Sequence, residues 1–406
     1  MKMLFSMAWK NIWRNKLRSL IIMTAIALGL LGGLLASSVS YGMAEQMVET
    51  IVRTRTFHLQ ISNPRFRDDR DVKYYVPDAQ GLVQRFDSLP QVVAAAPRII
   101  VSAMASSPKT ALGVDIYGII PQKEKTLSII DESIVKGSYF GGDRGNEAVV
   151  GQELAKRLDL RVGSRIVLTF QNAQGTITGG AFRISGLYRT PSTEFDRTTV
   201  FVQAQDLSTL LETELHFQQV AVLFTDLKAL DTTLAQVKSW VPEMRIETWK
   251  ELAPELAFMS QTMSLSLYIF MLVILLALAF GIINTMLMVV LERRRELGML
   301  MAVGMKHKTL FSMIVLETIA LSVTGALVGM ALAALTLTVL SRTGINLGIF
   351  AEGLREFGVG EVLYPYIPWT MYPVLGIMVV VVAVLSAVYP AIRALKLKPA
   401  EALRTV

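Results

Sequence analysis

The chain of 406 residues is more apolar than a soluble protein and more charged than a protein buried wholly in lipid. It is 52% hydrophobic and 18% charged, with a mean hydropathy of +0.46. These values exclude an ordinary soluble protein and indicate a membrane protein with a sizeable soluble part. Because the sequence has no cysteine, disulfides and thiolate metal sites are excluded as well.

The net charge of +7 reflects membrane topology and not a nucleic-acid partner. Residues 1–18, 292–308 and 393–406 together hold 14 Lys or Arg against three acidic residues, whereas residues 42–262 hold 24 against 26. Short basic segments beside apolar runs lie in the cytoplasm by the positive-inside rule. The sequence therefore predicts cytoplasmic termini and a large external segment.

The first predicted element is an amphipathic helix at residues 1–18. Trp9 and Trp13 lie on one helical face, and Lys10 and Arg14 lie on another. Such a helix is typical of the cytoplasmic interface of a membrane, with tryptophan at the level of the lipid headgroups.

The apolar run at residues 19–41 predicts the first transmembrane helix, since about 20 apolar residues cross a bilayer. Gly29 and Gly33 give it a small face for helix packing. A basic segment followed by an apolar run also resembles a cleaved signal peptide. The spanning length and the tryptophan-bearing segment before it favour a retained helix.

Residues 42–263 alternate strand and helix patterns and predict one large α+β domain. Residues 92–103 have the pattern of a strand, and residues 79–89 that of a helix ended by a proline. Residues 165–170 and 181–188 are expected to pair as a hairpin. The helical pattern from residue 249 to 263 runs into the next apolar run without an obvious hinge.

We find no catalytic or metal-binding constellation in this domain. The histidines lack metal-ligand spacing. Glu194 and Asp196 resemble a carboxylate pair, but Arg189 and Arg197 flank them in the sequence. Exposed charge pairing is the expected arrangement, so we assign no catalytic, cofactor-binding or metal-binding residues.

The second predicted span, residues 264–291, and the third, residues 310–340, each contain one strongly polar residue. Asn284 is expected to hydrogen-bond to a neighbouring helix. Glu317 lies about two helical turns from the basic loop, so we expect a salt bridge to Lys306 or Lys308, or an interfacial role.

The third span also carries Gly325 and Gly329, which predict a second close-packing face. A short outer loop at residues 341–368 leads to the fourth span at residues 369–390, which we expect to end at Tyr389-Pro390. A cytoplasmic tail at residues 391–406 follows.

The loop at residues 292–309 has the most ordered pattern in the chain, Glu292-Arg-Arg-Arg-Glu-Leu-Gly-Met-Leu-Met-Ala-Val-Gly304. Leu297, Leu300, Met301 and Met305 recur near helical spacing and predict a short amphipathic helix. The alternative is an ordinary loop whose basic residues only set the membrane topology by the positive-inside rule. The ordered Glu, Arg and Gly positions favour a helix that docks on another protein.

Together with Leu316-Glu317 and the tail Pro390-Ala-x-Arg-Ala-x-x-x-x-Pro399-Ala-Glu-Ala-Leu-Arg404, this loop resembles the FtsX/MacB-type ABC transporter permease family. The organisation is most similar to LolC/LolE-like lipoprotein-releasing permeases. Gly151-Gln-Glu-Leu-Ala-Lys-Arg-Leu resembles the family's periplasmic core domain, where a helix leads into a barrel-like subdomain.

The resemblance implies a fold of four transmembrane helices, with a MacB-like periplasmic α+β domain between helices 1 and 2. It also implies that the loop is a cytoplasmic coupling helix docked on an ATPase subunit. The residues that match this site are Glu292, Arg293, Arg294, Arg295, Glu296, Leu297, Gly298, Met301, Ala302 and Gly304.

The expected function is that of a permease subunit in the bacterial inner membrane. The sequence has no Gly-x-x-x-x-Gly-Lys-Ser/Thr motif. We therefore expect no enzyme activity in this chain, and place ATP and Mg on two copies of a separate ATPase. A second permease copy or paralogue would complete the transporter. Its mechanism would be mechanotransmission, in which ATP hydrolysis moves the periplasmic domain.

The most similar members imply extraction of lipoproteins. The alternatives are MacB-like efflux of peptides or toxins with a periplasmic adaptor, and FtsX-like regulation of a cell-wall hydrolase. The hairpin segment at residues 171–180 is short and lacks proline. It therefore does not support docking of a periplasmic chaperone there, and the chaperone or adaptor stays open.

Overall fold

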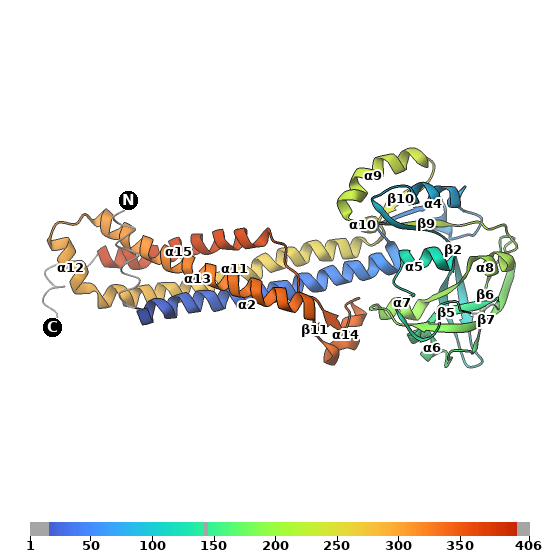
Figure 1. The fold of residues 1–406 in the computed structure, drawn as a ribbon, viewed down its shortest axis with the longest axis horizontal. Helices are drawn as coiled ribbons and strands as arrows, with labels where there is room; N and C mark the ends of the chain where they lie inside the picture. The colour runs from blue at the N-terminus through green and yellow to red at the C-terminus, as the bar shows by residue number, and fades with distance from the viewer. Residues whose placement is uncertain (1–15, 142–144, 396–406) are drawn as a thin grey trace. The chain divides into compact units, whose positions relative to one another are not determined.

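The computed structural model describes residues 16–141 and 145–395 (Figure 1). They form two compact units. The helical unit contains the described residues through Ala44, Gln261–Ile345 and the described residues from Leu363 onward; the α+β unit contains Glu45–Ser260 and Asn346–Val362. Most of the predicted interfacial helix at residues 1–18, and the tail beyond Leu395, lie outside the described residues.

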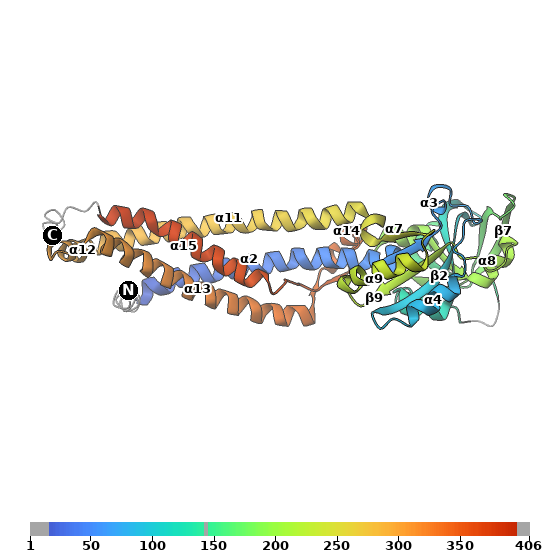
Figure 2. The same ribbon diagram turned by 90° about the horizontal axis from the view of Figure 1, so that it is seen from above.

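Four helices in the described part of the chain are long and apolar enough to cross a membrane. They are α2 (Lys16–Ile51), α11 (Pro254–Glu292), α13 (His307–Thr343) and α15 (Met371–Leu395). Within the helical unit these helices run side by side, as Figure 1 and Figure 2 both show. The short helix α12 (Arg294–Ala302) lies between α11 and α13 in the chain.

Glycines on α2 allow α11 to approach closely. A Cβ atom added to Gly29 would lie 2.8 Å from a methyl group of Leu278, and one added to Gly33 would lie 3.2 Å from Ile274 Cδ1. Small residues of this kind let transmembrane helices pack by close van der Waals contact.

Glycines on α13 bring that helix against the backbone of α2. An added Cβ would lie 2.9 Å from the Met23 carbonyl oxygen at Gly325, and 2.7 Å from the Ala27 carbonyl oxygen at Gly329. A backbone oxygen cannot move aside as a flexible side chain can, so this contact requires glycine. The glycines of α2 and α13 therefore face two different neighbours.

Asn284 lies on the outward side of α11. Ile282 and Met286, two residues before and after it, are buried in the apolar interior of the helical unit. Since α-helical neighbours at this spacing point to opposite sides, Asn284 is exposed. The expected bond to a neighbouring helix is not formed among the described residues.

Helix α15 continues past the proline at which we expected it to end. Pro390 lies inside the helix, which runs on to Leu395. Ala391 and Ala394 are fully buried, and both belong to the helical unit. Packing of these small residues stabilises the last turn although proline removes one backbone donor.

The described residues of the α+β unit form a sheet of ten strands. They are β1 (Leu59–Ser62), β2 (Val92–Ser106), β3 (Ala111–Ile119), β4 (Ile134–Gly137), β5 (Glu147–Gly151), β6 (Arg165–Gln171), β7 (Ile177–Tyr188), β8 (Thr199–Gln203), β9 (Gln219–Phe224) and β10 (Arg245–Thr248). The path of pairing runs β10-β1-β9-β2-β3-β8-β5-β7-β4. The fold class predicted from the sequence, a large α+β domain between the first two spans, is confirmed.

The long strand β2 joins two parts of this sheet. Its first half pairs with β9, and its second half pairs with β3 and β6. Strands β2, β3, β8, β5, β7 and β6 pair in turn, and β6 returns to β2. These pairings close a ring, which is the barrel-like arrangement that the resemblance implied. Strands β10, β1 and β9 extend from β2 as an open sheet.

The helices around the sheet are mostly short. They are η1 (Val52–Thr56), α3 (Phe66–Asp69), α4 (Ala79–Asp87), α5 (Pro121–Leu127), α6 (Gln152–Arg157), α7 (Thr193–Thr198), α8 (Ala204–Leu211), α9 (Leu227–Trp240), α10 (Trp249–Leu252), η2 (Gly348–Phe350) and α14 (Ala351–Glu356). Strands β11 (Ile345–Asn346) and β12 (Val362–Leu363) flank the last two. Apolar residues from both sheet parts, such as Leu59 and Ile166, form one continuous core.

Two local predictions need correction. Strand β7 begins at Ile177, so the loop of the β6–β7 hairpin covers only residues 172–176. The helix predicted over residues 249–263 is interrupted at Ala253, whose φ is −130°. The reason is Pro254, which starts α11, has no backbone N–H and disfavours helical geometry at the residue before it.

Candidate functional site

Helix α12 has an inner face that packs on the helical unit. Leu297 is 2% exposed, and Leu300, Met301 and Met305 pack against the apolar interior of that unit. Gly298 is also buried. The apolar face of the predicted amphipathic helix therefore packs against the rest of this chain, and this packing positions α12.

The outer face of α12 carries the residues that are free to contact a partner. Met299 is 55% exposed and Val303 is 84% exposed, and Arg295 is exposed on the same side. These three residues follow at intervals of four, so they align along one side of the helix. The residues predicted from the motif did not include Met299 and Val303. In the sequence, both are apolar residues four positions apart that lie outside the predicted apolar set of Leu297, Leu300, Met301 and Met305.

The residues assigned to coupling from the sequence are divided between these faces. Glu292, Arg295, Ala302 and Gly304 are exposed; Arg293, Arg294, Glu296 and Met301 are partly buried; Leu297 and Gly298 are buried. The structure thus brings only part of the predicted set to the surface.

An ion pair ties the start of α12 to α13. Arg293 Nη1 lies 3.1 Å from one Glu317 carboxylate oxygen and 3.2 Å from the other. Arg293 Nε donates to Glu296 at 3.1 Å. We expected Lys306 or Lys308 as the partner of Glu317, but both lysines are exposed. This partly buried Arg293–Glu317 pair therefore links the start of α12 to α13.

The turn from α12 into α13 depends on a glycine. Gly304 has a φ of +99°, which residues with a Cβ rarely adopt. The chain extends again at Lys306, the residue before α13. The backbone conformation at position 304 therefore explains why the motif has a glycine there.

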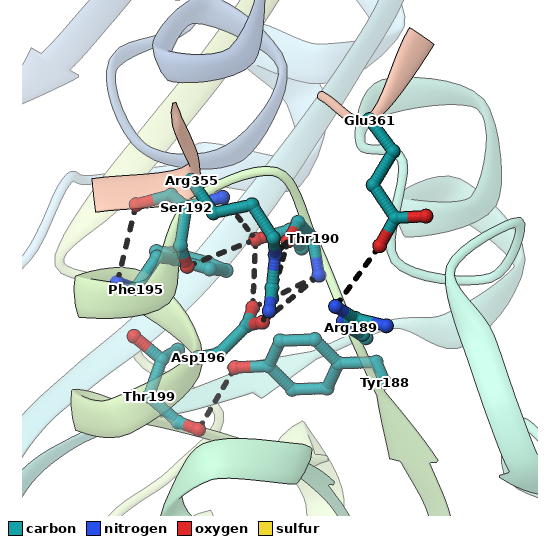
Figure 3. A network of polar contacts seen from close by, with 9 residues as sticks. All are labelled: Tyr188, Arg189, Thr190, Ser192, Phe195, Asp196, Thr199, Arg355 and Glu361. Carbon is teal, nitrogen blue, oxygen red and sulfur yellow. Dashed lines mark hydrogen bonds and ion pairs between the residues drawn. The ribbon is translucent and has the colours of Figure 1, made fainter. Parts of the chain in front are cut away.

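A second polar cluster lies in the α+β unit and is shown in Figure 3. Arg355 of α14 donates through Nε and Nη2 to the Thr190 carbonyl oxygen, at 3.2 and 2.8 Å, and through Nη2 to Asp196 at 2.8 Å. Thr190 also donates to Asp196 through its backbone N–H and its hydroxyl. All three residues are at most 5% exposed.

Further contacts hold the same segment in the α+β unit. Arg189 pairs with Glu361 at 3.0 Å, as Figure 3 shows. Thr50 Oγ1 donates to the Gly358 carbonyl oxygen at 2.8 Å. The segment Asn346–Val362, which the sequence presented as part of a plain outer loop, is therefore an integral part of this unit.

The expectation of exposed charge pairing is wrong for Asp196, which is fully buried. Burial raises the pKa of Asp196 to about 7, although hydrogen bonds from Thr190 and the charge of Arg355 act against that rise. No local signal identifies Arg355 as its partner, because the two residues are 159 positions apart. Among the described residues no group of three or more His, Cys, Asp or Glu could hold a metal ion.

Comparison with known proteins agrees with this architecture. The profile of the MacB-like periplasmic core domain matches residues 19–240, and that of the FtsX-like permease C-terminal region matches residues 268–399. LolE, a transmembrane protein of the lipoprotein-releasing system of Haemophilus influenzae, is 20% identical over 80% of this chain and 80% of its own length. LolC of Xylella fastidiosa is 23% identical over 78% of each chain.

Likeness is also found to macrolide exporters and to a solved structure. MacB of Brucella abortus, a macrolide export ATP-binding/permease protein, is 26% identical over 33% of this chain and 22% of its own length. The crystal structure of the periplasmic region of MacB from Actinobacillus actinomycetemcomitans covers 54% of this chain and 97% of that chain, with a TM-score of 0.36 and 13% identity. The periplasmic-core profile alone covers more than half of the chain, so this protein belongs to the MacB/FtsX-type family of ABC transporter permeases.

Proposed function

We propose that this permease releases lipoproteins from the inner membrane, driven by a separate ATPase that docks on α12. The similarity to LolE extends over 80% of both chains, whereas that to MacB covers 33% of this chain. A lipoprotein substrate requires a surface for acyl chains more than a hydrated pathway.

The observation that carries the proposal is an apolar groove between α2 and α11. Its volume is about 340 Å³, and its lining includes Ile21 and Ala25 of α2 and Ala277 and Gly281 of α11. Nothing lies within 4 Å of the Cβ position of Gly281, so the groove is open at that point. A groove of this composition suits an acyl chain and not an ion or a polar solute.

The proposed mechanism is mechanotransmission through a dimer of permeases. Two ATPase subunits would close on binding ATP and push on the outer faces of two α12 helices. The Arg293–Glu317 pair would pass this force to α13, and the contacts of α11 with Gly29 and Gly33 would pass it to α2. The termini and α12 would lie in the cytoplasm, and the α+β unit in the periplasm.

The test combines co-purification with a substitution on α12. The tagged full-length chain is isolated in mild detergent, and bound proteins are identified by mass spectrometry. Val303→Asp places a charge on the outer face and should reduce ATPase recovery at least about tenfold, as expected for a central interface residue. Ile177→Asp, at an equally apolar and 73% exposed position of the α+β unit, should leave recovery unchanged.

The bound proteins decide between the functions. An ATPase together with acylated lipoproteins supports lipoprotein release. An ATPase with an adaptor and an outer-membrane channel supports efflux, and one with a cell-wall hydrolase supports regulation. Recovery of no ATPase, or equal recovery with Val303→Asp, contradicts coupling through α12.

A further inference from the structure

The α+β unit contains a cavity of about 680 Å³, within the range of sites that hold small ligands. Part of its wall is apolar and comes from Met47 and Ile51 of α2, Leu256 and Met259 of α11, and Phe357. These residues belong to the ends of the two groove-forming helices and to the segment that Arg355 holds. The rest of the lining is polar.

The floor of the cavity is a buried polar part of the sheet. Gln60 and Ser62 of β1, Gln219 of β9 and Glu247 of β10 line it, and each is at most 8% exposed. The other residues of β1, such as Ile61, are fully buried in the apolar core. Burying amides in this way costs free energy unless they have hydrogen-bond partners.

The floor amides form a chain that ends in a free acceptor. Gln219 Nε2 donates to Gln60 Oε1 at 2.7 Å, and Gln60 Nε2 donates to the Arg55 carbonyl oxygen at 2.7 Å. Gln219 Oε1 is buried and has no hydrogen-bond partner among the described residues. Buried polar atoms are usually hydrogen-bonded in folded proteins, so a donor on a bound molecule would satisfy this oxygen.

Charges in the lining restrict the ligand. Arg67 is paired with Glu247, and Arg70 is paired with an aspartate. The remaining charged groups form no ion pair within the described chain: Arg55, Glu194, Glu255 and Glu356. One free cation against three free carboxylates disfavours a phosphate headgroup and favours a ligand rich in N–H donors.

We propose that this cavity binds an extended polypeptide segment, the one next to the lipid anchor of a membrane-tethered substrate. Peptide N–H groups supply donors for Gln219 Oε1 and for the carboxylates, and peptide carbonyls accept from Arg55. The apolar wall accommodates side chains of the segment. This inference rests on the proposed function, in which the acyl chains of the substrate bind the groove between α2 and α11.

The test uses the purified full-length chain in nanodiscs and three fluorescent probes. The first is a short lipopeptide whose N-terminal cysteine carries a diacylglyceryl group and which has a benzophenone in its peptide part. The second is the same peptide without lipid, and the third is a photoreactive diacylglycerol. Photoadducts are mapped by mass spectrometry, and affinities are measured by anisotropy.

We expect lipopeptide adducts on cavity residues such as Met259 and Phe357. Gln219→Leu should weaken lipopeptide binding about fivefold, which is the usual effect of one lost hydrogen bond. Arg55→Gln, at an exposed position where folding is not at risk, should weaken it similarly. The matched control Gln174→Leu, at an exposed hairpin position, should have no effect.

Three results would overturn the inference. The first is that lipopeptide adducts are found only outside the cavity. The second is that Gln219→Leu and Arg55→Gln both bind the lipopeptide with unchanged affinity. The third is that the photoreactive diacylglycerol labels the cavity and neither peptide probe does. The proposed function fails separately. If both peptides label the cavity but the reconstituted complex releases no lipoprotein, the peptide site stands and lipoprotein release does not.

Discussion

Replacing Arg355 by alanine should free the segment Asn346–Val362 from the α+β unit. The guanidinium makes hydrogen bonds of 2.8 to 3.2 Å to the Thr190 carbonyl and to Asp196. Its removal leaves a buried carboxyl group without its cation, a change that costs about 3–5 kcal/mol in buried pairs. Thr190 still donates to that carboxyl group, and the raised pKa of Asp196 lets the group take up a proton once Arg355 is gone. We therefore expect a cost at the lower end of this range, about 3 kcal/mol.

The assay is amide hydrogen exchange on the purified full-length chain in detergent. A loss of about 3 kcal/mol corresponds to roughly a hundredfold rise in the open population. Amides of α14 should therefore exchange about a hundred times faster, while those of the distant strand β6 stay protected. Arg355→Lys keeps the charge but not the planar fork of donors, so it should give an intermediate rate.

The control is Arg342→Ala, which removes the same charge at an exposed position near the end of α13. It should leave exchange in α14 unchanged. If Arg355→Ala and Arg342→Ala give the same rates, the buried cluster does not hold this segment and the reasoning is refuted.

Three further predictions concern packing, the α12 ion pair and pH. Gly329→Ala should destabilise the helical unit by about 1–3 kcal/mol, since the new Cβ would meet a backbone oxygen at 2.7 Å. The control is Gly281→Ala, whose Cβ meets nothing within 4 Å. Equal melting temperatures of the two variants would contradict this packing. Glu317→Ala removes one of the two carboxylate partners of the partly buried Arg293, which still pairs with Glu296. It should therefore lower stability by about 1–3 kcal/mol in thermal unfolding; an unchanged melting temperature would disprove the pair. Because the pKa of Asp196 is raised to about 7, the folded chain holds a proton that the unfolded chain has released above its ordinary pKa of 3.8. Stability should therefore fall as the pH rises from 3.8 toward 7. In Asp196→Asn the melting temperature should depend less on pH over that range; an unchanged pH dependence would assign the effect to other groups.

Local sequence was sufficient for elements that depend on length, periodicity or a cap. The four spans follow from uninterrupted apolar runs, because a single segment of this length satisfies its own backbone hydrogen bonds inside lipid only as a helix. Strand β2 begins at Val92 and helix α4 begins at Ala79, where the sequence predicted a strand and a helix to begin. Helix α9 begins where Asp226 accepts a hydrogen bond from the Ala229 N–H, a contact typical of a capping residue.

Local sequence was not sufficient where one pattern permits two arrangements. The periodicity of α12 predicts an amphipathic helix, but packing decides that its apolar face points inward and that Met299 and Val303 remain exposed. Pro390 predicts a helix end, yet buried alanines after it keep α15 helical. At Pro390, packing in the helical unit outweighs a local preference of about 3 kcal/mol.

The sequence by itself determined the class of this protein: its four spans, their order and the α+β domain between the first two. Only the tertiary structure decided which charged residues are partners. Arg293 meets Glu317, and Arg355 meets Asp196 across 159 positions of sequence. The polar floor around Gln219 is likewise assembled from separate strands. Such pairs arise because a buried charge or amide needs a partner, and only the folded chain shows which one lies within reach.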